Sequence, residues 1–314
     1  EQMGEEQQQQ QQMNNKQVGV FAEIASRMKE YEADAETMQR IDSEKPYMIR
    51  LDGHTFHTFA APFNKPFDEG LHEIMVNVTK DLLGYFNTAT CGYTQSDEIT
   101  LIFPALNPKD IADDKRRTLD FNGRIQKTAT LAAGFCSSRF TYWCLQLAND
   151  GHTFTQEKTE KYDRVMTKLL QGSAHFDGRV FNVDNEAELL NNLKWRSSFD
   201  CVRNSRTNLA RAHFNQKEIT GLSARQAVDK LLNEKGVNWE DCPASFKYGT
   251  FVKREKRTIQ AVNEKTQQPV DAVRTTMVAK SFGFPSDFQS DLSDLLLIRY
   301  WNDVPEETLA RMKR

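Results

Sequence analysis

The sequence lacks the features that mark disulfide-rich, zinc-ribbon and membrane proteins. Its 314 residues include five cysteines. This odd number, with no Cys-x-x-Cys pair, excludes a disulfide framework and a zinc ribbon. No apolar run approaches the roughly 20 residues of a transmembrane helix, so we expect no membrane protein. The chain shows no secretory signal, and its thiols suit a reducing compartment. The cytoplasm is favoured, with the mitochondrion left open because the chain does not begin with Met.

The chain also lacks the excess of positive charge that nucleic-acid-binding proteins often have. The chain has 41 Lys and Arg against 44 Asp and Glu, for a net charge of −3. Local basic runs matter more than the net charge, although a single run more often marks a solvated face. The sequence contains three such groups: Lys115-Arg116-Arg117; Arg203, Arg206 and Arg211; and Lys253 to Arg257.

The length and the 39% of apolar residues allow a sizeable core. Residues 1–17 are rich in Gln and almost free of apolar groups, which predicts a disordered tail. A helical period begins at Val18, and we expect residues 18–284 to form the main region. Residues 285–314 are predicted as a C-terminal helical extension that docks through Leu295, Leu296 and Trp301.

The order of predicted elements favours an α+β fold. Strands are expected at 47–51, 99–103 and 176–183, helices at 71–86 and about 118–147, and a polar turn at 93–98. This order is typical of a ferredoxin-like or palm-type antiparallel sheet with helices. Further along, Ser223 and Gln226 form a capping-box pattern for a helix that ends at Gly236. Residues 246–262 and 270–282 read as a β-hairpin.

Acidic residues follow or precede two of the predicted strands. Asp52 ends the first strand beside Gly53, and Asp97 and Glu98 precede the second. If the strands are neighbours, these carboxylates converge, and Mg²⁺ prefers one or two carboxylates together with phosphate oxygens. Two such ions can promote an in-line displacement at phosphorus. Taken alone, each of these segments is more often a turn.

The surrounding residues resemble a known family. Residues 50–59, Arg-Leu-Asp-Gly-His-Thr-Phe-His-Thr-Phe, resemble the RLDGxxFHxF motif of the tRNA-His guanylyltransferase superfamily. Residues 64–68 resemble its KPxD motif, and residues 93–98 its YxQSDE motif. Shorter matches follow in the family's order: Phe121, Arg124 and Lys127; Phe176 to Arg179; Trp195-Arg196; and Gly249-Thr250. The resemblance extends from about residue 46 to residue 252.

This resemblance implies a polymerase-like palm joined to a helical region, assembled as a homotetramer. It implies nucleotide addition in the 3′-to-5′ direction to the 5′ end of tRNA or a tRNA-like RNA. ATP would activate a 5′-monophosphate by adenylylation, and the 3′-hydroxyl of GTP or another NTP would displace AMP. Two Mg²⁺ ions and fixed cationic and N–H donors would stabilise the charge on the phosphates.

The resemblance also implies roles for single residues. Asp52 and Asp97 would bind both metal ions, the Gly53 carbonyl one of them, and Glu98 would be a third catalytic acid. The residues expected at the nucleotide are Gly53, His54, Thr55, Phe56, His57, Lys65, Ser96, Arg124 and Lys127. Of these, the amides of residues 54–57 would hold a triphosphate at a helix start. The spacing of His54 and His57 also suits zinc, but no further His or Cys lies near them in the sequence.

The sequence departs from the family pattern after Asp200-Cys201. The guanylyltransferases carry HINNLYN there, whereas this chain has Val202-Arg203-Asn204-Ser205-Arg206-Thr207-Asn208. Loss of the histidine is typical of the guanylyltransferase-like proteins, which repair RNA 5′ ends by copying the opposite strand. We therefore favour template-dependent repair over addition of a single G to tRNA-His. The same residues would also suit a non-catalytic module that binds tRNA 5′ ends, or a nucleotide cyclase. Arg203, Asn204, Arg206 and Asn208 are candidate RNA contacts, and Lys235 is a doubtful activation lysine.

Overall fold

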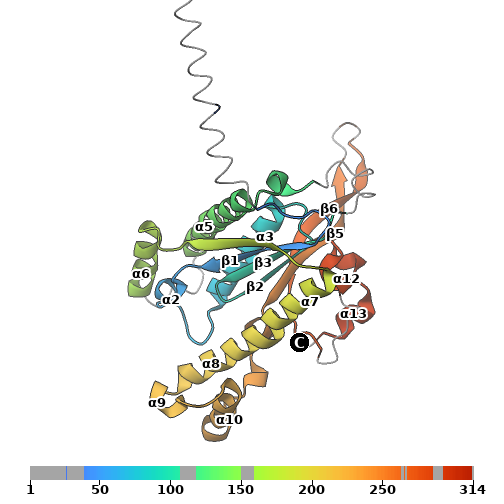
Figure 1. The fold of residues 1–314 in the computed structure, drawn as a ribbon. Helices are drawn as coiled ribbons and strands as arrows, with labels where there is room; N and C mark the ends of the chain where they lie inside the picture. Colours follow the sequence, from blue (N-terminus) through green and yellow to red (C-terminus); the bar gives the residue numbers. More distant parts are fainter. Residues whose placement is uncertain are drawn as a thin grey trace, which may run out of the picture.

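An antiparallel six-stranded sheet forms the centre of the computed structural model (Figure 1). The structure describes residues 39–106, 118–149, 159–262, 267–285 and 293–312, together with Ser26 and Lys265. The strands, in the order β4-β1-β3-β2-β5-β6, are Phe176–Asn182, Tyr47–Gly53, Glu98–Phe103, Cys91–Gln95, Thr250–Val262 and Pro269–Lys280. The predicted tail at 1–17, the helix expected from Val18 and the basic run Lys115–Arg117 lie outside the described residues.

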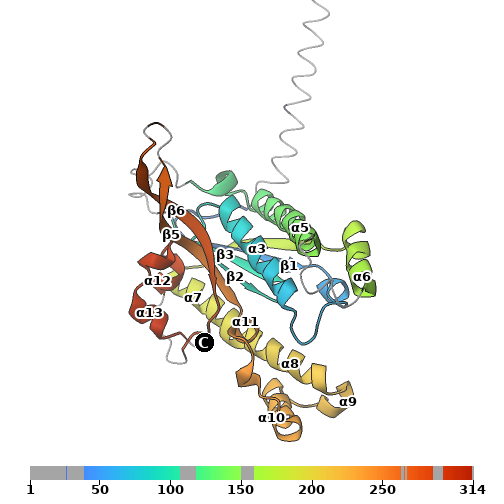
Figure 2. The ribbon, with the colours of Figure 1, turned by 180° about the vertical axis from the view of Figure 1, so that it is seen from behind.

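Two long helices cover one face of the sheet, α3 (Glu69–Tyr85) and α5 (Ile125–Asn149), as Figure 2 shows. Because side chains alternate along a strand, Ile49 and Leu51 of β1 point into the core beneath these helices, whereas Met48 belongs to another cluster. The chain passes through β1, α3, β2, β3, α5 and β4 in turn, with every neighbouring pair antiparallel. The α+β antiparallel fold predicted from the sequence is therefore confirmed.

The opposite face is partly covered by α7 (Glu186–Lys194) and by the C-terminal segment. This segment contains α12 (Ser293–Leu297), η5 (Trp301–Asp303) and α13 (Glu306–Ala310). Leu295, Leu296 and Trp301 are buried in one cluster with Met48 and Phe251 of the sheet, so the predicted docking of the C-terminal residues is confirmed.

A helical lobe continues from α7 (Figure 1). The π-helical segment η2 (Trp195–Cys201) leads into α8 (Val202–His213), which packs on α10 (Ala224–Lys235). The lobe also includes α9 (Gln216–Ile219), η3 (Trp239–Asp241) and α11 (Ala244–Tyr248). The predicted capping box of Ser223 and Gln226 is present, and Gly236 ends α10 with a positive φ of 68°.

Three segments differ from the sequence-based prediction. The helix expected at about 118–147 begins only at Ile125, because Phe121 and Asn122 have positive φ values and Arg124 is extended. Residues 93–98 are not one polar turn, because residues up to Gln95 form β2, paired with both β3 and β5. Its polar side chains are satisfied internally: the Thr94 hydroxyl, for example, donates to the Glu98 carbonyl at 2.9 Å. The predicted strand at 246–262 begins only at Thr250, because Tyr248 ends α11. The remaining helices are α2 (Phe56–Phe59), η1 (Asp120–Gly123) and α6 (Thr159–Leu170).

Candidate active site

Three acidic residues meet at the end of β1. In the strand register, Asp52 lies opposite Glu98 of β3 on one side and Asp177 of β4 on the other. The Gly53 amide donates to the Asp97 carbonyl at 3.1 Å, which joins the end of β1 to the turn between β2 and β3. The expectation that the two acidic strands are neighbours is thus confirmed. A glycine is required at 53, since an added Cβ would lie 2.5 Å from the Phe56 ring.

Arginines neutralise Glu98 and leave Asp97 without a cationic partner among the ion pairs of the described residues. Arg50 Nη2 lies 2.9 Å from Glu98 Oε1 and 3.1 Å from Asp52 Oδ2. Arg196 Nη1 lies 3.4 Å from the other Glu98 oxygen. The Asp97 carboxylate accepts a hydrogen bond from the Ser96 hydroxyl at 2.9 Å. Glu98 is therefore held as the centre of an ion-pair network, whereas Asp97 keeps an uncompensated charge.

The local electrostatics favour a cation beside these acids. Burial raises the pKa of Asp97, and the charges of Asp52 and Glu98 raise it further, although the Ser96 hydroxyl acts against this. Burial and the Glu98 charge also raise the pKa of Asp52, while Arg50 lowers it. Within the described ranges, no three His, Cys, Asp or Glu side chains form a metal-binding group. The donors that fit a metal are two carboxylates and the Gly53 carbonyl, and Mg²⁺ completes such a set with water and phosphate oxygens.

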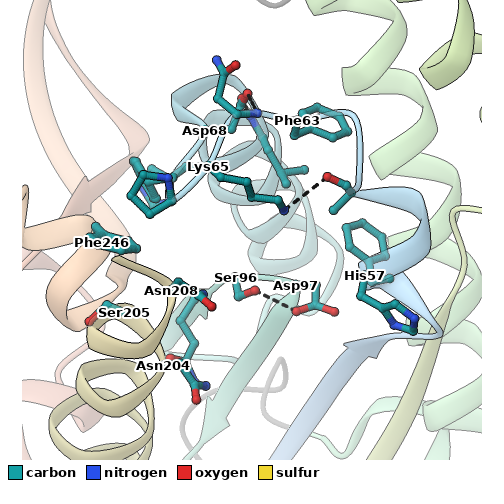
Figure 3. Close-up of a pocket in the computed structure, with 18 of the residues that line it drawn as sticks. His57, Phe63, Lys65, Asp68, Ser96, Asp97, Asn204, Ser205, Asn208 and Phe246 are labelled. Carbon is teal, nitrogen blue, oxygen red and sulfur yellow. Dashed lines mark hydrogen bonds between the residues drawn. The ribbon is translucent and has the colours of Figure 1, made fainter. Parts of the chain in front are cut away.

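A cavity of about 430 Å³ opens beside Asp97, between the α2 loop, α3, the β2–β3 turn and the helical lobe (Figure 3). Among the predicted site residues, those that line it are Gly53, Thr55, Phe56, His57, Lys65, Ser96, Asp97, Asn204 and Asn208. Phe63, Phe67, Leu71 and Phe246 give one part of the wall an apolar surface. The cavity therefore combines apolar side chains with the charged groups of Lys65 and Asp97, a combination found in sites for small polar ligands.

The loop from Asn64 to Asp68 is fixed by one buried carboxylate. Asp68 is the N-cap of α3 and accepts from the Leu71 amide at 2.9 Å. Its second oxygen accepts from the Asn64 amide, also at 2.9 Å, so the loop is closed on the helix start. This closure holds Lys65, whose Nζ lies 3.4 Å from the Ala60 carbonyl and extends over the cavity in Figure 3.

The backbone amides of residues 54–57 have two kinds of surroundings. One amide is hydrogen-bonded, and the other three lie at the start of a helix. The His54 amide donates to the His175 carbonyl at 2.9 Å, and the two imidazole rings stack at 5.0 Å. This amide is therefore not free for a triphosphate, contrary to our expectation for His54. Thr55 has a left-handed φ of 49° and precedes α2, so the amides of residues 55–57 have no intrahelical acceptor.

The four candidate RNA contacts have different surroundings, although Arg203 Nη2 lies 3.4 Å from Asn204 Oδ1. Asn204 and Asn208 are one turn apart on α8 and line the cavity. Arg203 instead pairs with Asp200 at 3.0 Å, and the Arg206 guanidinium lies over the Trp239 ring at 4.3 Å. The structure therefore groups the two asparagines with the predicted nucleotide-binding residues.

Arg124 and Lys127 do not line the cavity. They lie at the start of α5, where Arg124 Nε donates to the Phe121 carbonyl at 3.4 Å and Lys127 Nζ lies 5.8 Å from the Phe121 ring centre. If these two residues bind phosphate, they do so outside the cavity.

Several cavity residues were missed by sequence reasoning. Asp68 belongs to the KPxD match, so its motif could have identified it. His72 had no such signal: burial lowers its pKa to about 4, and its Nε2 lies 3.1 Å from the Thr250 hydroxyl. Ser245 and Phe246 reach the cavity only because α11 folds back from the end of the helical lobe.

Comparisons with known proteins identify the family of this chain. A model of the Thg1 family, described as tRNAHis guanylyltransferase, matches residues 25–184. The uncharacterized protein R259 of Acanthamoeba polyphaga mimivirus is 33% identical over 74% of this chain and 77% of its own length. A probable tRNA(His) guanylyltransferase of Drosophila melanogaster is 26% identical over 75% of each chain.

Solved structures show the same similarity. A bacterial tRNA(His) guanylyltransferase (Thg1)-like protein in complex with ATP has a TM-score of 0.60 and 28% identity, covering 74% of this chain and 87% of its own. A second such structure, in complex with GTP, has a TM-score of 0.54 and 26% identity over 81% and 90% of the two chains. None of the described helices is both long and apolar enough to cross a membrane.

Proposed function

Because this chain belongs to the tRNA-His guanylyltransferase family and is one of its nucleotidyltransferases, we propose that it repairs the 5′ end of a tRNA-like RNA. It does so by adding nucleotides in the 3′-to-5′ direction, each chosen by pairing with the opposite strand. The six-stranded sheet serves as a polymerase-like palm for this reaction. Two solved structures similar to this chain are complexes with ATP and with GTP, which supports nucleotide binding in its cavity.

Our choice of repair over addition of a single G rests on the residue at position 202, which is valine. It follows Cys201 where the guanylyltransferases carry the histidine of HINNLYN, and it packs against the apolar cluster of the helical lobe. Asn204 and Asn208 nevertheless keep their places in the cavity. The cavity therefore retains amide groups that can bind a nucleotide, whereas position 202 offers no imidazole for recognising one particular RNA end.

The cavity binds the incoming NTP in this proposal. Its apolar wall accommodates the base, and Asn204 and Asn208 offer hydrogen bonds to the base or ribose. Lys65 and the amides of residues 55–57 neutralise the triphosphate, because a flexible ammonium and N–H groups at a helix start both suit phosphate oxygens.

The acids position the reacting groups beside the cavity, which Asp97 and Gly53 line and Asp52 and Glu98 do not. Asp52, Asp97 and the Gly53 carbonyl would hold two Mg²⁺ ions, which supply electrostatic stabilisation of the attacking and leaving oxygens. Arg50 and Arg196 hold Glu98 and keep the register of β1 and β3, so Glu98 is a positioning residue. The NTP 3′-hydroxyl attacks the activated 5′ phosphorus of the RNA, and AMP leaves from a 5′-adenylylated end or pyrophosphate from a 5′-triphosphate.

The test uses a tRNA transcript that lacks its first nucleotide and carries a 5′-triphosphate, with Mg²⁺ and each NTP in turn. The base that faces the gap is varied, and extension of the 5′ end is followed on a gel. Template-dependent repair predicts that the added nucleotide follows the opposing base by Watson–Crick pairing.

Two other outcomes would contradict this proposal. Addition of G alone, and only to tRNA-His, would assign the chain to single-nucleotide guanylylation, as in the Drosophila relative's name. RNA binding without addition of any nucleotide would indicate a binding module. A matched variant, Asp184→Asn, changes an exposed carboxylate that pairs with Lys45 beyond the far end of β4 from Asp177, and should behave as the wild type.

A further inference from the structure

Two large aromatic side chains are exposed on the π-helical segment η2. Trp195 is 47% exposed and Phe199 is 59% exposed, although both belong to a helix whose Ser197, Asp200 and Cys201 are buried. Residues four apart lie on the same side of a helix, so Trp195 and Phe199 project from one side of η2, and we call this side the aromatic surface. Single exposed apolar residues are common, whereas apolar residues that gather on one exposed face can mark a binding surface.

Arginines accompany both rings. The Arg196 guanidinium lies 4.3 Å from the centre of the Trp195 ring, and that of Arg203 lies 5.9 Å from the centre of the Phe199 ring. The Arg203 side chain is itself 56% exposed. Exposed aromatic rings interleaved with guanidinium groups form the kind of surface that binds single-stranded nucleic acid, because bases stack on the rings and phosphates pair with the arginines.

The aromatic surface is directly connected to the acidic end of β1. Arg196, stacked on Trp195, lies 3.4 Å from Glu98, and Glu98 faces Asp52 in the strand register. A base stacked on Trp195 would therefore be separated from Asp52 by the side chains of Arg196 and Glu98. Arg196 Nη1 also donates to Asp200 Oδ2 at 2.9 Å, so the guanidinium beside Trp195 is fixed by two carboxylates.

We propose that Trp195 and Phe199 form a stacking platform for an unpaired base of the RNA whose 5′ end is extended. This inference rests on the proposed function, because it assumes that a frayed or gapped RNA end reaches Asp52. An end that is being rebuilt has an unpaired opposing base, and an aromatic surface beside the acids would keep that base ordered. Stacking is tolerant of base identity, as repair of different ends requires.

The experiment compares Trp195→Ala and Phe199→Ala with the conservative variants Trp195→Phe and Phe199→Tyr. Tyr142→Ala is the matched control, because Tyr142 is similarly exposed, at 40%, but lies on α5. The RNA carries 2-aminopurine at the base opposite the missing 5′ nucleotide, so that stacking quenches its fluorescence. KM for RNA, KM for NTP and kcat are measured on gapped RNA and on a blunt-ended duplex.

We expect each alanine variant to raise KM for the gapped RNA about 5- to 100-fold and to lose the quenching, with little change in KM for NTP. The conservative variants and Tyr142→Ala should resemble the wild type, and the blunt duplex should be affected less. Trp195→Ala could also raise KM by moving Arg196, which lies against the Trp195 ring. Phe199→Ala tests stacking without this effect, because the Phe199 ring lies near Arg203. If Trp195→Ala does not fold, Phe199→Ala and the quenching by wild-type protein still decide the matter.

Unchanged KM for RNA and unchanged quenching in both alanine variants would overturn the platform. It would also be overturned if the variants changed the mass of the assembly but not RNA affinity, since the rings would then bind protein. A wild-type protein that adds no nucleotide but quenches 2-aminopurine would contradict the proposed function and leave the platform standing.

Discussion

Replacing Asp97 with asparagine should abolish nucleotide addition and, at the same time, stabilise the metal-free protein. Burial and the nearby charges of Asp52 and Glu98 raise the pKa of Asp97 above its ordinary value of 3.8. A carboxyl whose pKa is higher in the folded than in the unfolded protein destabilises the folded state at pH values above its ordinary pKa. Asparagine has the same shape, can still accept from the Ser96 hydroxyl, and carries no charge.

The expected gain in the free energy of unfolding is about 0.5–2 kcal/mol at pH 7, the range seen when a functional site is made less strained. The gain should shrink as the pH falls toward 4, because the wild-type carboxyl then becomes neutral. Mg²⁺, in contrast, should stabilise the wild type more than the variant. At about 100 times its Kd, it should stabilise the wild type by roughly 2.7 kcal/mol and the variant by much less.

The measurement is urea unfolding at pH 7 and pH 4.5, with and without Mg²⁺, together with single-turnover nucleotide addition. Asp184→Asn serves as the control, because it removes an exposed carboxylate near Lys45 without touching the acids of β1. An Asp97→Asn protein that still gains stability from Mg²⁺ to the same extent, or still adds nucleotides, would refute the assignment of Asp97 as a metal ligand.

Three further predictions test how the site is positioned. Asp68→Ala removes two hydrogen bonds at a buried N-cap, so it should cost about 2–4 kcal/mol of stability in urea and raise KM for NTP by loosening Lys65, whereas Asp68→Asn should retain most of both. His72→Gln should flatten the pH dependence of stability: burial lowers the His72 pKa to about 4, so the wild type should lose up to about 3 kcal/mol between pH 6.5 and 4. Gly249→Ala should cost about 2–4 kcal/mol by urea unfolding, because its Cβ would lie 2.5 Å from the Tyr93 hydroxyl at a φ of 78°, whereas Gly172→Ala, with a φ of 68° and open space, should cost about 1 kcal/mol. Equal losses for the two glycine variants would mean that the close contact at Gly249 is unimportant.

The sequence by itself determined the elements whose patterns are local. The short apolar run at residues 47–51 predicted the buried strand β1, and the 3.6-residue period identified α3 from residues such as Ile74 and Leu82. Asp52 and Asp97 could be selected in advance because each belongs to a long motif and each adjoins a predicted strand. Since neighbouring strands in an α+β unit are brought together by the fold, those two acids could be expected to converge.

Only the tertiary structure decided what depends on packing between distant segments. Periodicity could not recognise β2, because an interior strand buries polar residues such as Thr94 by pairing on both sides. Nor could it show that Glu98 is neutralised by Arg196 from η2, whose contact spans almost one hundred residues. The structure likewise showed that Asn204 of α8 lines the same cavity as Asp97. A motif identifies the type of side chain at a site, whereas its orientation and partners follow from how helices pack on the sheet.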